Sequence, residues 1–394
     1  MTTLISVTVQ SDWVEVISDV LRGTVASESF WVSCYRKGSA SVHGSVQVKK
    51  SLVESHSVEL TGKDETRNYE TIIKGTKATF KTHNSAIKSM DISPGGGLFV
   101  TGDNEGLLKV GDTSDGNYLN IERIERTCAD ITTCRFFPSG QVVLSGASDF
   151  QLRIWSALDG SNPVTLKGHN KGVTDSAIID RGRNVLSSAR DGTVRLWECG
   201  SASIIRTIGN YTCAVNKISL GLFPSESIIE RKPDNEIDSR EVATDDKLVI
   251  CVLEDGNIKG IDLMSKEEAF TTKSYRNVPL HSCAYSPKHN LVAVGSAEGV
   301  IEVFDIRNIN RDLFAIQRND STIYDLVFIE ETGDLLIGQG DGSAFQIPTV
   351  LTSNISQASQ EFIGFDMDPI YSIREINNGK FIYAAGRDGS LRRF

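Results

Sequence analysis

The sequence predicts an all-β protein whose main part is a seven-bladed β-propeller, preceded by a small N-terminal α+β subdomain. Two observations predict the propeller. A tight turn, followed six positions later by a site that is usually large and apolar, recurs seven times, and most recurrences lie 42 to 47 residues apart. The short alternating apolar runs between these turns are typical of strands. Repeats of this length with four strands each are typical of propeller blades.

The repeat is clearest in the stretch LSSARDGTVRLWECG, residues 186–200, where Asp191 lies in the turn and Trp197 follows six positions later. The same spacing is found at six other places. The pairs are Glu105 with Gly111, Asp149 with Trp155, Asp255 with Ile261, Glu298 with Phe304, Asp341 with Ile347 and Asp388 with Phe394. The turn-to-turn spacings are 44, 42, 64, 43, 43 and 47 residues, so the 64 marks an insertion between the third and fourth units.

Four side chains of the third unit resemble the buried, hydrogen-bonded tetrad of WD repeats, which makes the predicted architecture a WD40 propeller. They are His169, Ser187, Asp191 and Trp197. The histidine can bridge the carboxylate and the hydroxyl, and the indole N–H can donate to the hydroxyl. We therefore interpret the set as structural and not as a catalytic triad. Only the first unit also keeps the histidine, as His83, so most other blades should depend on apolar packing.

Residues 1–74 lack the repeat pattern and predict the N-terminal subdomain. Asp12 and Glu15 could form a capping box at the start of a helix. This helix would have one apolar face, made of Trp13, Val16, Ile17, Val20 and Leu21. Strand-like runs follow at residues 30–35 and 42–48.

The propeller is expected over residues 75–394. Its last unit stops at Phe394, the apolar position after the turn, so no residues remain there for an outermost strand. An open sheet edge of this kind is normally covered. We therefore expect residues 75–81 to pair with the last blade as its closing strand.

The insertion spans residues 221–246 and contains eight acidic and three basic residues. Its net charge is therefore half of the chain's net charge of −10. Its polar composition predicts a mobile loop. Two interpretations stay open, namely a solvated loop without a function and an acidic arm that contacts a partner.

Composition and motifs argue against several classes of function. The net charge of −10 disfavours nucleic acid as a partner. The chain has no long apolar run, no signal-peptide pattern and no C-x-x-C pair among its seven cysteines, so we expect no membrane contact and a cytoplasmic and nuclear location. It has no phosphate-binding loop, zinc-protease motif or nucleophile elbow, so we expect no catalytic residue, metal or cofactor.

The surface of the propeller is then the best candidate for function. Side chains at the start of each innermost strand, together with the turns beside them, should surround the mouth of the ring. Aromatic residues and arginine, which dominate protein-binding hot spots, occur among them. The residues expected to contact a protein partner are Lys88, Asp130, Asp175, Arg190, Glu254, His281, Tyr324, Tyr371 and Arg387.

Longer stretches of the chain resemble one WD-repeat family, the proteasomal ATPase-associated factors. The resemblance is carried by CRFFPSGQVVLSG (134–146), IIDRGRNVLSSARDGTVRLWECG (178–200), QGDGSAF (339–345) and GRDGSLRRF (386–394). It implies a chaperone that binds the C-terminal domain of one ATPase subunit of the proteasome regulatory particle. Such a chaperone holds the subunit back from the proteolytic core until the base is assembled. Gly111, where the family usually has tryptophan, departs from the pattern.

An alternative from another class is a general WD40 interaction adaptor, for example the substrate receptor of a ubiquitin ligase. An enzymatic role ranks third, because no motif supports one. In either binding role the protein is expected to be a monomer before it joins a complex.

Overall fold

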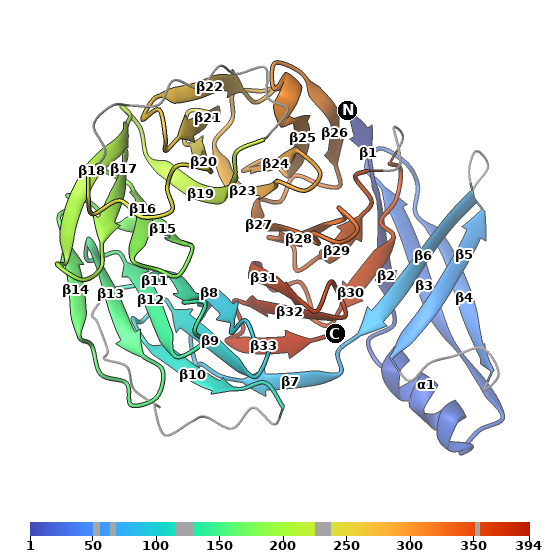
Figure 1. The fold of residues 1–394 in the computed structure, drawn as a ribbon. Coiled ribbons are helices and arrows are strands. Elements are labelled where there is room, and N and C mark those ends of the chain that lie inside the picture. The colour runs from blue at the N-terminus through green and yellow to red at the C-terminus, as the bar shows by residue number, and fades with distance from the viewer. Residues whose placement is uncertain (50–55, 64–67, 115–128, 225–237, 351–354) are drawn as a thin grey trace.

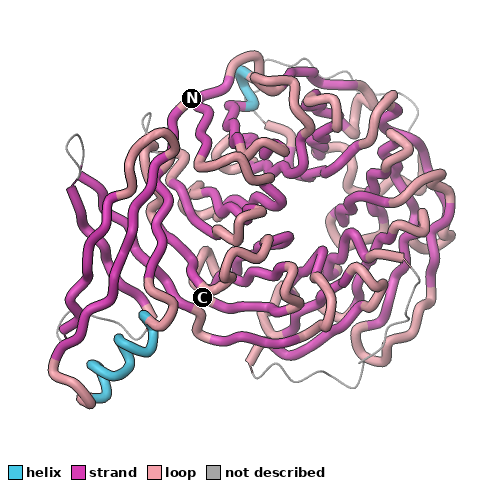
Figure 2. Tube along the Cα trace, turned by 180° about the vertical axis from the view of Figure 1, so that it is seen from behind, coloured by secondary structure: helices cyan, strands magenta, loops and turns pink. Residues whose placement is uncertain are grey.

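The computed structural model describes residues 1–49, 56–63, 68–114, 129–224, 238–350 and 355–394. Strands in these ranges form seven sheets around a central axis, and one further sheet stands beside the ring (Figure 1). The view from behind shows the same closed ring with the N-terminal sheet at its side (Figure 2). The predicted fold class, a WD40 propeller, is confirmed.

The innermost strand of each sheet lies against that of the next, and β31 contacts β8, which closes the ring. These strands are β8 (Ile87–Ile92), β11 (Ile131–Phe136), β15 (Val173–Ile179), β19 (Val215–Leu222), β23 (Leu280–Ser286), β27 (Ile323–Phe328) and β31 (Ile370–Ile376). We number the blades one to seven in this order.

The other strands of each blade follow outward in antiparallel order. In the described residues blade one adds β9 (Leu98–Asp103) and β10 (Leu108–Asp112). Blade two adds β12 (Val142–Ala147), β13 (Gln151–Ser156) and β14 (Val164–Lys167). Blade three adds β16 (Asn184–Ala189), β17 (Thr193–Glu198) and β18 (Ser203–Asn210). Blade four adds β20 (Lys247–Leu253), β21 (Asn257–Asp262) and β22 (Glu268–Lys273).

Blade five adds β24 (Leu291–Ser296), β25 (Val300–Asp305) and β26 (Asp312–Gln317), with a short 3-10 helix at Ile306–Asn308. Blade six adds β28 (Leu335–Gln339), β29 (Ala344–Ile347) and β30 (Gln360–Ile363). Blade seven adds β32 (Phe381–Gly386) and β33 (Ser390–Arg393). Its fourth strand is β7 (Ala78–Lys81), which pairs antiparallel with β33 and joins the two ends of the propeller.

The N-terminal region has its own small core. Strands β2 (Ile5–Val9), β3 (Ser27–Arg36) and β4 (Val42–Lys49) form a sheet, and helix α1 (Trp13–Arg22) packs on one of its faces. Trp13, Val16, Ile17 and Val20 are buried there, as the helical periodicity predicts, and Leu21 is partly buried. The predicted capping box is wrong, because the Asp12 side chain makes no capping hydrogen bond. At its other end the helix stops at Gly23, which has φ 80°.

The same region also extends the blades, which the sequence does not reveal. Strand β1 (Thr2–Thr3) pairs parallel with β26 of blade five. Strand β6 (Asn68–Gly75) pairs parallel with β30 of blade six and antiparallel with β5 (Ser57–Lys63). The expected boundary between residues 74 and 75 therefore falls inside β6, and the two parts share a sheet. Covering sheet edges removes unpaired backbone groups, which explains the arrangement.

The insertion is shorter than expected at both ends. Residues 225–237 of it lie outside the described residues. Residues 221 and 222 still belong to β19, so the predicted start is wrong. At the other end the chain is held on blade three, because Asn184 Nδ2 donates to the Arg240 carbonyl at 3.0 Å and Val242 N donates to Asn184 Oδ1 at 2.7 Å. Arg206 and Glu241 add an ion pair at 3.0 Å. Residues 238–246 are therefore not a mobile loop.

Candidate functional site

A β-bulge occurs at the same place in every innermost strand. The strand register shifts at the second residue, so that this residue has no direct partner on the neighbouring strand. A bulge of this kind turns its side chain away from the regular pleat. The bulged residues are all partly exposed, and we call them the mouth: Lys88, Thr132, Thr174, Asn216, His281, Tyr324 and Tyr371.

Three mouth residues in consecutive blades are used to join blades. Thr132 Oγ1 donates to the Val173 carbonyl at 2.8 Å, and Thr174 Oγ1 donates to the Val215 carbonyl at 2.5 Å. Asn216 Nδ2 donates to the Leu280 carbonyl at 2.8 Å. Each bond connects one innermost strand to the next. The side chains of this half of the mouth are therefore small and polar, and they are engaged in hydrogen bonds between blades.

The other four mouth residues form a continuous row, which we call the aromatic arc. The rings of His281 and Tyr324 lie 6.4 Å apart, and those of Tyr324 and Tyr371 lie 4.8 Å apart in an edge-to-face arrangement. The Lys88 ammonium lies 3.7 Å from the centre of the Tyr371 ring, a cation–π contact. These residues come from blades five, six, seven and one, so half of the mouth presents amphipathic rings to solvent.

Turn residues form a second circle around the mouth. Each is held by a backbone hydrogen bond to the loop that enters the innermost strand, as in Arg190 N to the Gly172 carbonyl at 2.9 Å and Glu254 N to the Ala214 carbonyl at 3.1 Å. Arg387 has the same place in blade seven, where its N–H donates to the Pro369 carbonyl. In blades five and six the place is taken by Ala297 and Gly340.

The turn residues beside His281 and Tyr324 are therefore small. A Cβ atom at Gly340 would lie 3.2 Å from Cε2 of Tyr324, so even alanine would crowd that ring. The exposed charges of Glu254 and Arg387 lie on either side of these two turns. A sector with amphipathic rings and small turn residues thus lies between two charged turn residues, Glu254 and Arg387.

The pKa values link the charged residues to the arc. Burial lowers the pKa of Lys88; the charge of Asp130 opposes this shift and that of Arg387 adds to it. Burial also lowers the pKa of His281, which favours the neutral imidazole, with Glu254 opposing and Arg190 adding to the shift. Burial and the neighbouring Tyr371 raise the pKa of Tyr324. By their positions on the bulges, turns and entry loops, eight of the nine expected contact residues surround one opening.

The ninth, Asp175, is not part of this surface. It is 1% exposed and lies one residue beyond the bulge at Thr174. Its carboxylate accepts hydrogen bonds from Thr133 Oγ1 at 3.1 Å and Ile218 N at 3.2 Å. The bulge changes which side chain faces the opening, and Asp175 instead joins three innermost strands below it.

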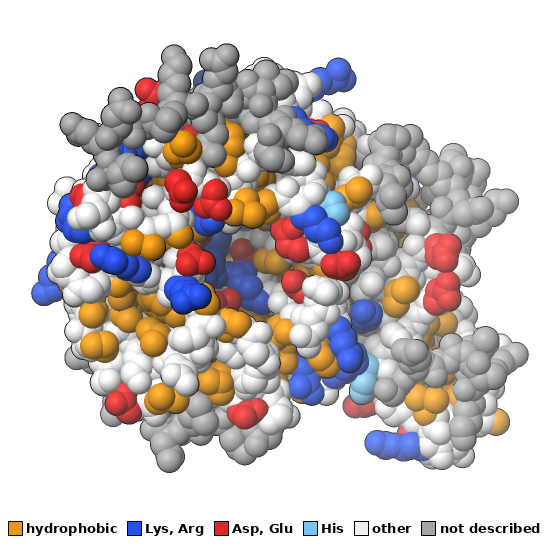
Figure 3. Space-filling model, in the orientation of Figure 1, with side chains coloured by type: hydrophobic (Ala, Val, Ile, Leu, Met, Phe, Trp, Pro, Cys, Tyr) orange, Lys and Arg blue, Asp and Glu red, His pale blue; other side chains and the backbone are white. Residues whose placement is uncertain are grey.

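A charged layer below the mouth was not expected from the sequence. Three acids and three bases from the innermost strands make it up, namely Asp91, Arg135, Asp175, Lys217, Asp325 and Arg374. The centre is Asp325, which is 2% exposed and lies 2.6 Å from Arg374 and 3.5 Å from Lys217. The face drawn in Figure 3 is hollowed at its centre, with Lys and Arg side chains inside the hollow and acidic side chains around it.

The basic residues of this layer stabilise the ionised carboxylate of Asp325. Burial by itself raises the pKa of the carboxyl, but the charges of Lys217, Arg374 and Arg135 lower it below its ordinary value. A charge at the third or fifth position of six of the seven innermost strands was the available signal in the sequence. Because the acids and bases balance, we assign the layer to holding the innermost strands together.

The tetrad of blade three has the geometry expected of a WD repeat. His169 Nδ1 lies 3.0 Å from Asp191, His169 Nε2 lies 2.7 Å from Ser187 Oγ, and Trp197 Nε1 donates to the same hydroxyl at 2.8 Å. In blade one, His83 lies 2.9 Å from Thr101 and 2.9 Å from Asp103. The carboxylate there comes from Asp103 and not from the turn residue Glu105.

The small residue Gly111 is compensated by a large residue on the neighbouring strand. In blades two and three a tryptophan pairs with a valine across the strands, as Trp197 does with Val185. In blade one Gly111 pairs with Phe99, whose ring fills the space beside the glycine. Phe99 is fully buried, so the blade keeps a packed core without the tryptophan.

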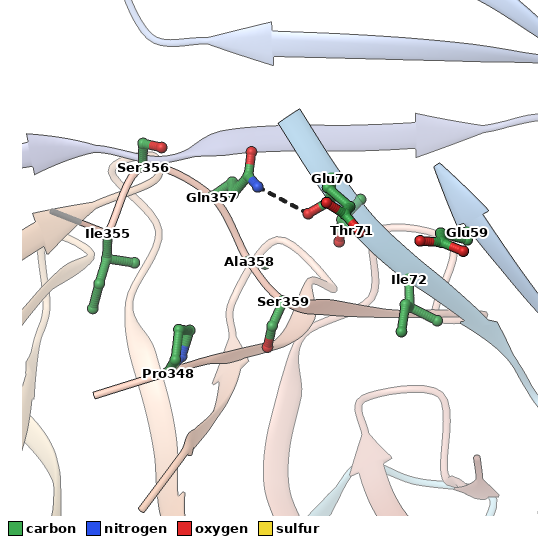
Figure 4. Close-up of a pocket in the computed structure, with 10 residues that line it drawn as sticks. All are labelled: Glu59, Glu70, Thr71, Ile72, Pro348, Ile355, Ser356, Gln357, Ala358 and Ser359. Carbon is green, nitrogen blue, oxygen red and sulfur yellow. Dashed lines mark hydrogen bonds between the residues drawn. The ribbon is translucent and has the colours of Figure 1, made fainter. Parts of the chain in front are cut away.

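A separate cavity of about 370 Å³ lies where β6 joins blade six (Figure 4). Gln357 Nε2 donates to the Glu70 carbonyl at 2.9 Å across it. No mouth residue reaches this cavity. Its lining comes from β5, β6 and the segments beside β29 and β30: Glu59, Glu70, Thr71, Ile72, Pro348, Ile355, Ser356, Gln357, Ala358 and Ser359.

In the described ranges no cluster of three or more His, Cys, Asp or Glu side chains could hold a metal ion. Within the same ranges no helix is long and apolar enough to cross a membrane.

Known proteins share the repeats of this chain. The family model "WD domain, G-beta repeat" matches residues 75–112, 123–156 and 160–198. Proteasomal ATPase-associated factor 1 of Gallus gallus is 32% identical, over 98% of this chain and 97% of that protein, and the Homo sapiens protein of the same name is 30% identical over the same shares. The 26S proteasome regulatory subunit RPN14 of Saccharomyces cerevisiae is 30% identical over 72% of each chain.

Proposed function

Since this chain belongs to the proteasomal ATPase-associated factor 1 family, we propose that it is a non-catalytic assembly chaperone of the proteasome regulatory particle. It binds the C-terminal domain of one ATPase subunit and controls when the base joins the proteolytic core. The observation that carries the proposal is the aromatic arc, the partly exposed row of His281, Tyr324, Tyr371 and Lys88 at the mouth.

The arc has the composition of a protein-binding hot spot. Tyrosine rings supply large contact areas at a low entropy cost, and charged residues at the rim set orientation and partner choice. Glu254 and Arg387 provide such a rim on the two sides of the sector with small turn residues. The rings are held by rigid strands, so little order has to be gained on binding.

The tetrad supports a role without catalysis. Ser187 is fully buried and His169 is 6% exposed, so no substrate can reach the hydroxyl. The Ser187 oxygen also accepts a hydrogen bond from the indole N–H of Trp197. This bond occupies a lone pair that a nucleophilic serine would use for attack.

The experiment is a pull-down of the full chain with each regulatory-particle ATPase C-terminal domain expressed separately. We expect one domain to be retained. Recovery of none of the domains would overturn the proposal, and recovery of ubiquitin-ligase subunits by proximity labelling in cells would favour a general adaptor instead.

We also propose that the free protein is a monomer located in the cytoplasm and nucleus. Light scattering and a fluorescent fusion test these two points. A stable dimer or a location confined to another compartment would contradict them.

A further inference from the structure

Six of the seven blades have glycine at one position of the turn beside the mouth. The backbone there is left-handed, with φ between 72° and 84°. The glycines are Gly106, Gly192, Gly256, Gly299, Gly342 and Gly389. In blade two the same position is Phe150, with φ 72°. A bulky L residue is strained in this conformation, so glycine would suit the fold better.

The other turns show why glycine is usual. A Cβ atom at Gly192 would lie 2.1 Å from the Tyr211 carbonyl oxygen, and one at Gly299 would lie 2.2 Å from that of Asn319. Phe150 is 45% exposed, so its ring contributes little to the core in return for the strain. Strain without a packing benefit is a mark of functional sites.

A second residue combines the same two features. Met367 has φ 69° and is 82% exposed, and it follows Asp366, with φ 45°. Among the described residues with positive φ, the non-glycines other than Phe150 and Met367 are Asp, Asn, Ala or Lys. The two bulky apolar residues in strained backbone are thus both exposed.

Both residues stand beside the mouth. Phe150 is two residues from Ser148, whose N–H donates to the Asp130 carbonyl at 3.0 Å. Met367 lies over the turn of blade six, because a Cβ atom at Gly342 would be 2.8 Å from the Met367 Cα. Blades seven and one lie between them, with the stacked pair of Tyr371 and Lys88. The two apolar side chains therefore bracket one end of the aromatic arc.

We propose that Phe150 and Met367 are apolar anchors that insert into two apolar pockets of the partner, on either side of a polar strip that faces Tyr371 and Lys88. The occupant is the folded ATPase C-terminal domain, so this inference rests on the proposed function. Because the backbone already holds both side chains outward, little backbone entropy is lost on binding, which offsets part of the cost of the strained conformation.

The test uses Phe150→Asn and Met367→Asn in the full chain, because asparagine tolerates left-handed backbone. The dissociation constant is measured against the ATPase domain that the wild-type protein retains. We expect each variant to bind roughly tenfold more weakly or worse, with a melting temperature no lower than that of the wild type. Leu158→Asn is the matched control, since Leu158 is 67% exposed beyond the other end of β13 and should bind normally.

The outcomes separate the two proposals. If the wild type binds and both variants bind with the same affinity, the anchor proposal is overturned and the proposed function stays intact. Failure of the wild type to bind any ATPase domain overturns the proposed function, and the anchors with it. A weaker variant that also melts at a lower temperature contradicts the strain argument, because the loss would then come from the fold.

Discussion

The guanidinium of Arg318 makes two hydrogen bonds to the carboxylate of Glu361, at 3.0 and 2.8 Å, with both side chains buried. Arg318 follows β26 of blade five and Glu361 lies in β30 of blade six. Arg318 Nε also donates to Ser6 Oγ of the N-terminal sheet at 2.9 Å. One arginine thus joins two blades to the region that covers their edges.

Removing one partner of this pair should destabilise the protein strongly. Glu361→Gln leaves the Arg318 charge buried without its counter-charge, which costs about 3 to 5 kcal/mol of unfolding free energy. The double variant Arg318→Met with Glu361→Gln should lose less than Glu361→Gln alone. Urea unfolding measures both. Asp320→Asn, which removes the exposed pair with Lys37, is the control and should change the free energy by at most about 1 kcal/mol.

Restoring tryptophan at Gly111 alone should be harmful. A Cβ atom there would lie 2.3 Å from the Phe99 ring, so Gly111→Trp overpacks the blade and should cost about 1 to 3 kcal/mol or more. Adding Phe99→Val recreates the pairing of Val185 with Trp197 and should recover much of the loss. Additive effects of the two substitutions in urea unfolding would show that the sizes are not coupled.

Acid should weaken blade three through His169. Burial lowers the pKa of its imidazole, which outweighs the opposing effect of Asp191. The folded state therefore prefers the neutral ring, so this contribution to stability is present above the unfolded pKa of about 6.5 and is lost as the pH falls below it. The melting temperature of the wild type should fall between pH 7.5 and pH 5.5 by more than that of His169→Gln. An equal fall in both proteins would refute this assignment.

Asn184→Ala should release the end of the insertion. The Asn184 side chain is fully buried and forms hydrogen bonds with the Trp197 carbonyl, the Arg240 carbonyl and the Val242 N–H, so its loss removes three hydrogen bonds to backbone groups. We expect a cost of about 1 to 3 kcal/mol in unfolding free energy and faster amide hydrogen exchange around residue 242. Unchanged exchange there would mean that other contacts hold this segment. The acidic-arm interpretation applies mainly to residues 225–237, outside the described residues.

Local patterns predict the blades well. The left-handed turn position and the spacing to the large apolar residue are both local in sequence, so they identify seven repeats without tertiary information. The tetrad of His169, Ser187, Asp191 and Trp197 follows from the same repeat. The sequence could also have shown how blade one compensates for Gly111, since Phe99 occupies the position in blade one that Val185 occupies in blade three.

The closing strand was predicted from the open edge of the last blade, and β7 does pair with β33, but the other pairings between distant segments could not be predicted. Strands β1 and β6 join blades five and six in parallel register, and no turn or periodicity announces a pairing between residues so far apart. The bulges have no local signal, so Asp175 was also counted among the contact residues, although the structure buries its carboxylate beside the bulge at Thr174. The candidate site was therefore predicted as a set of residues, but not as an arc with a polar half and an aromatic half.

The most direct test of the account is the affinity of Tyr324→Ala with Tyr371→Ala for the ATPase C-terminal domain that the wild type retains. Tyr35→Ala is the matched control, because Tyr35 is 44% exposed on the N-terminal sheet. The account predicts that the double variant melts within a few degrees of the wild type and binds at least about a hundredfold more weakly, or about 2.7 kcal/mol, while the control binds normally. Full affinity in the double variant would contradict it.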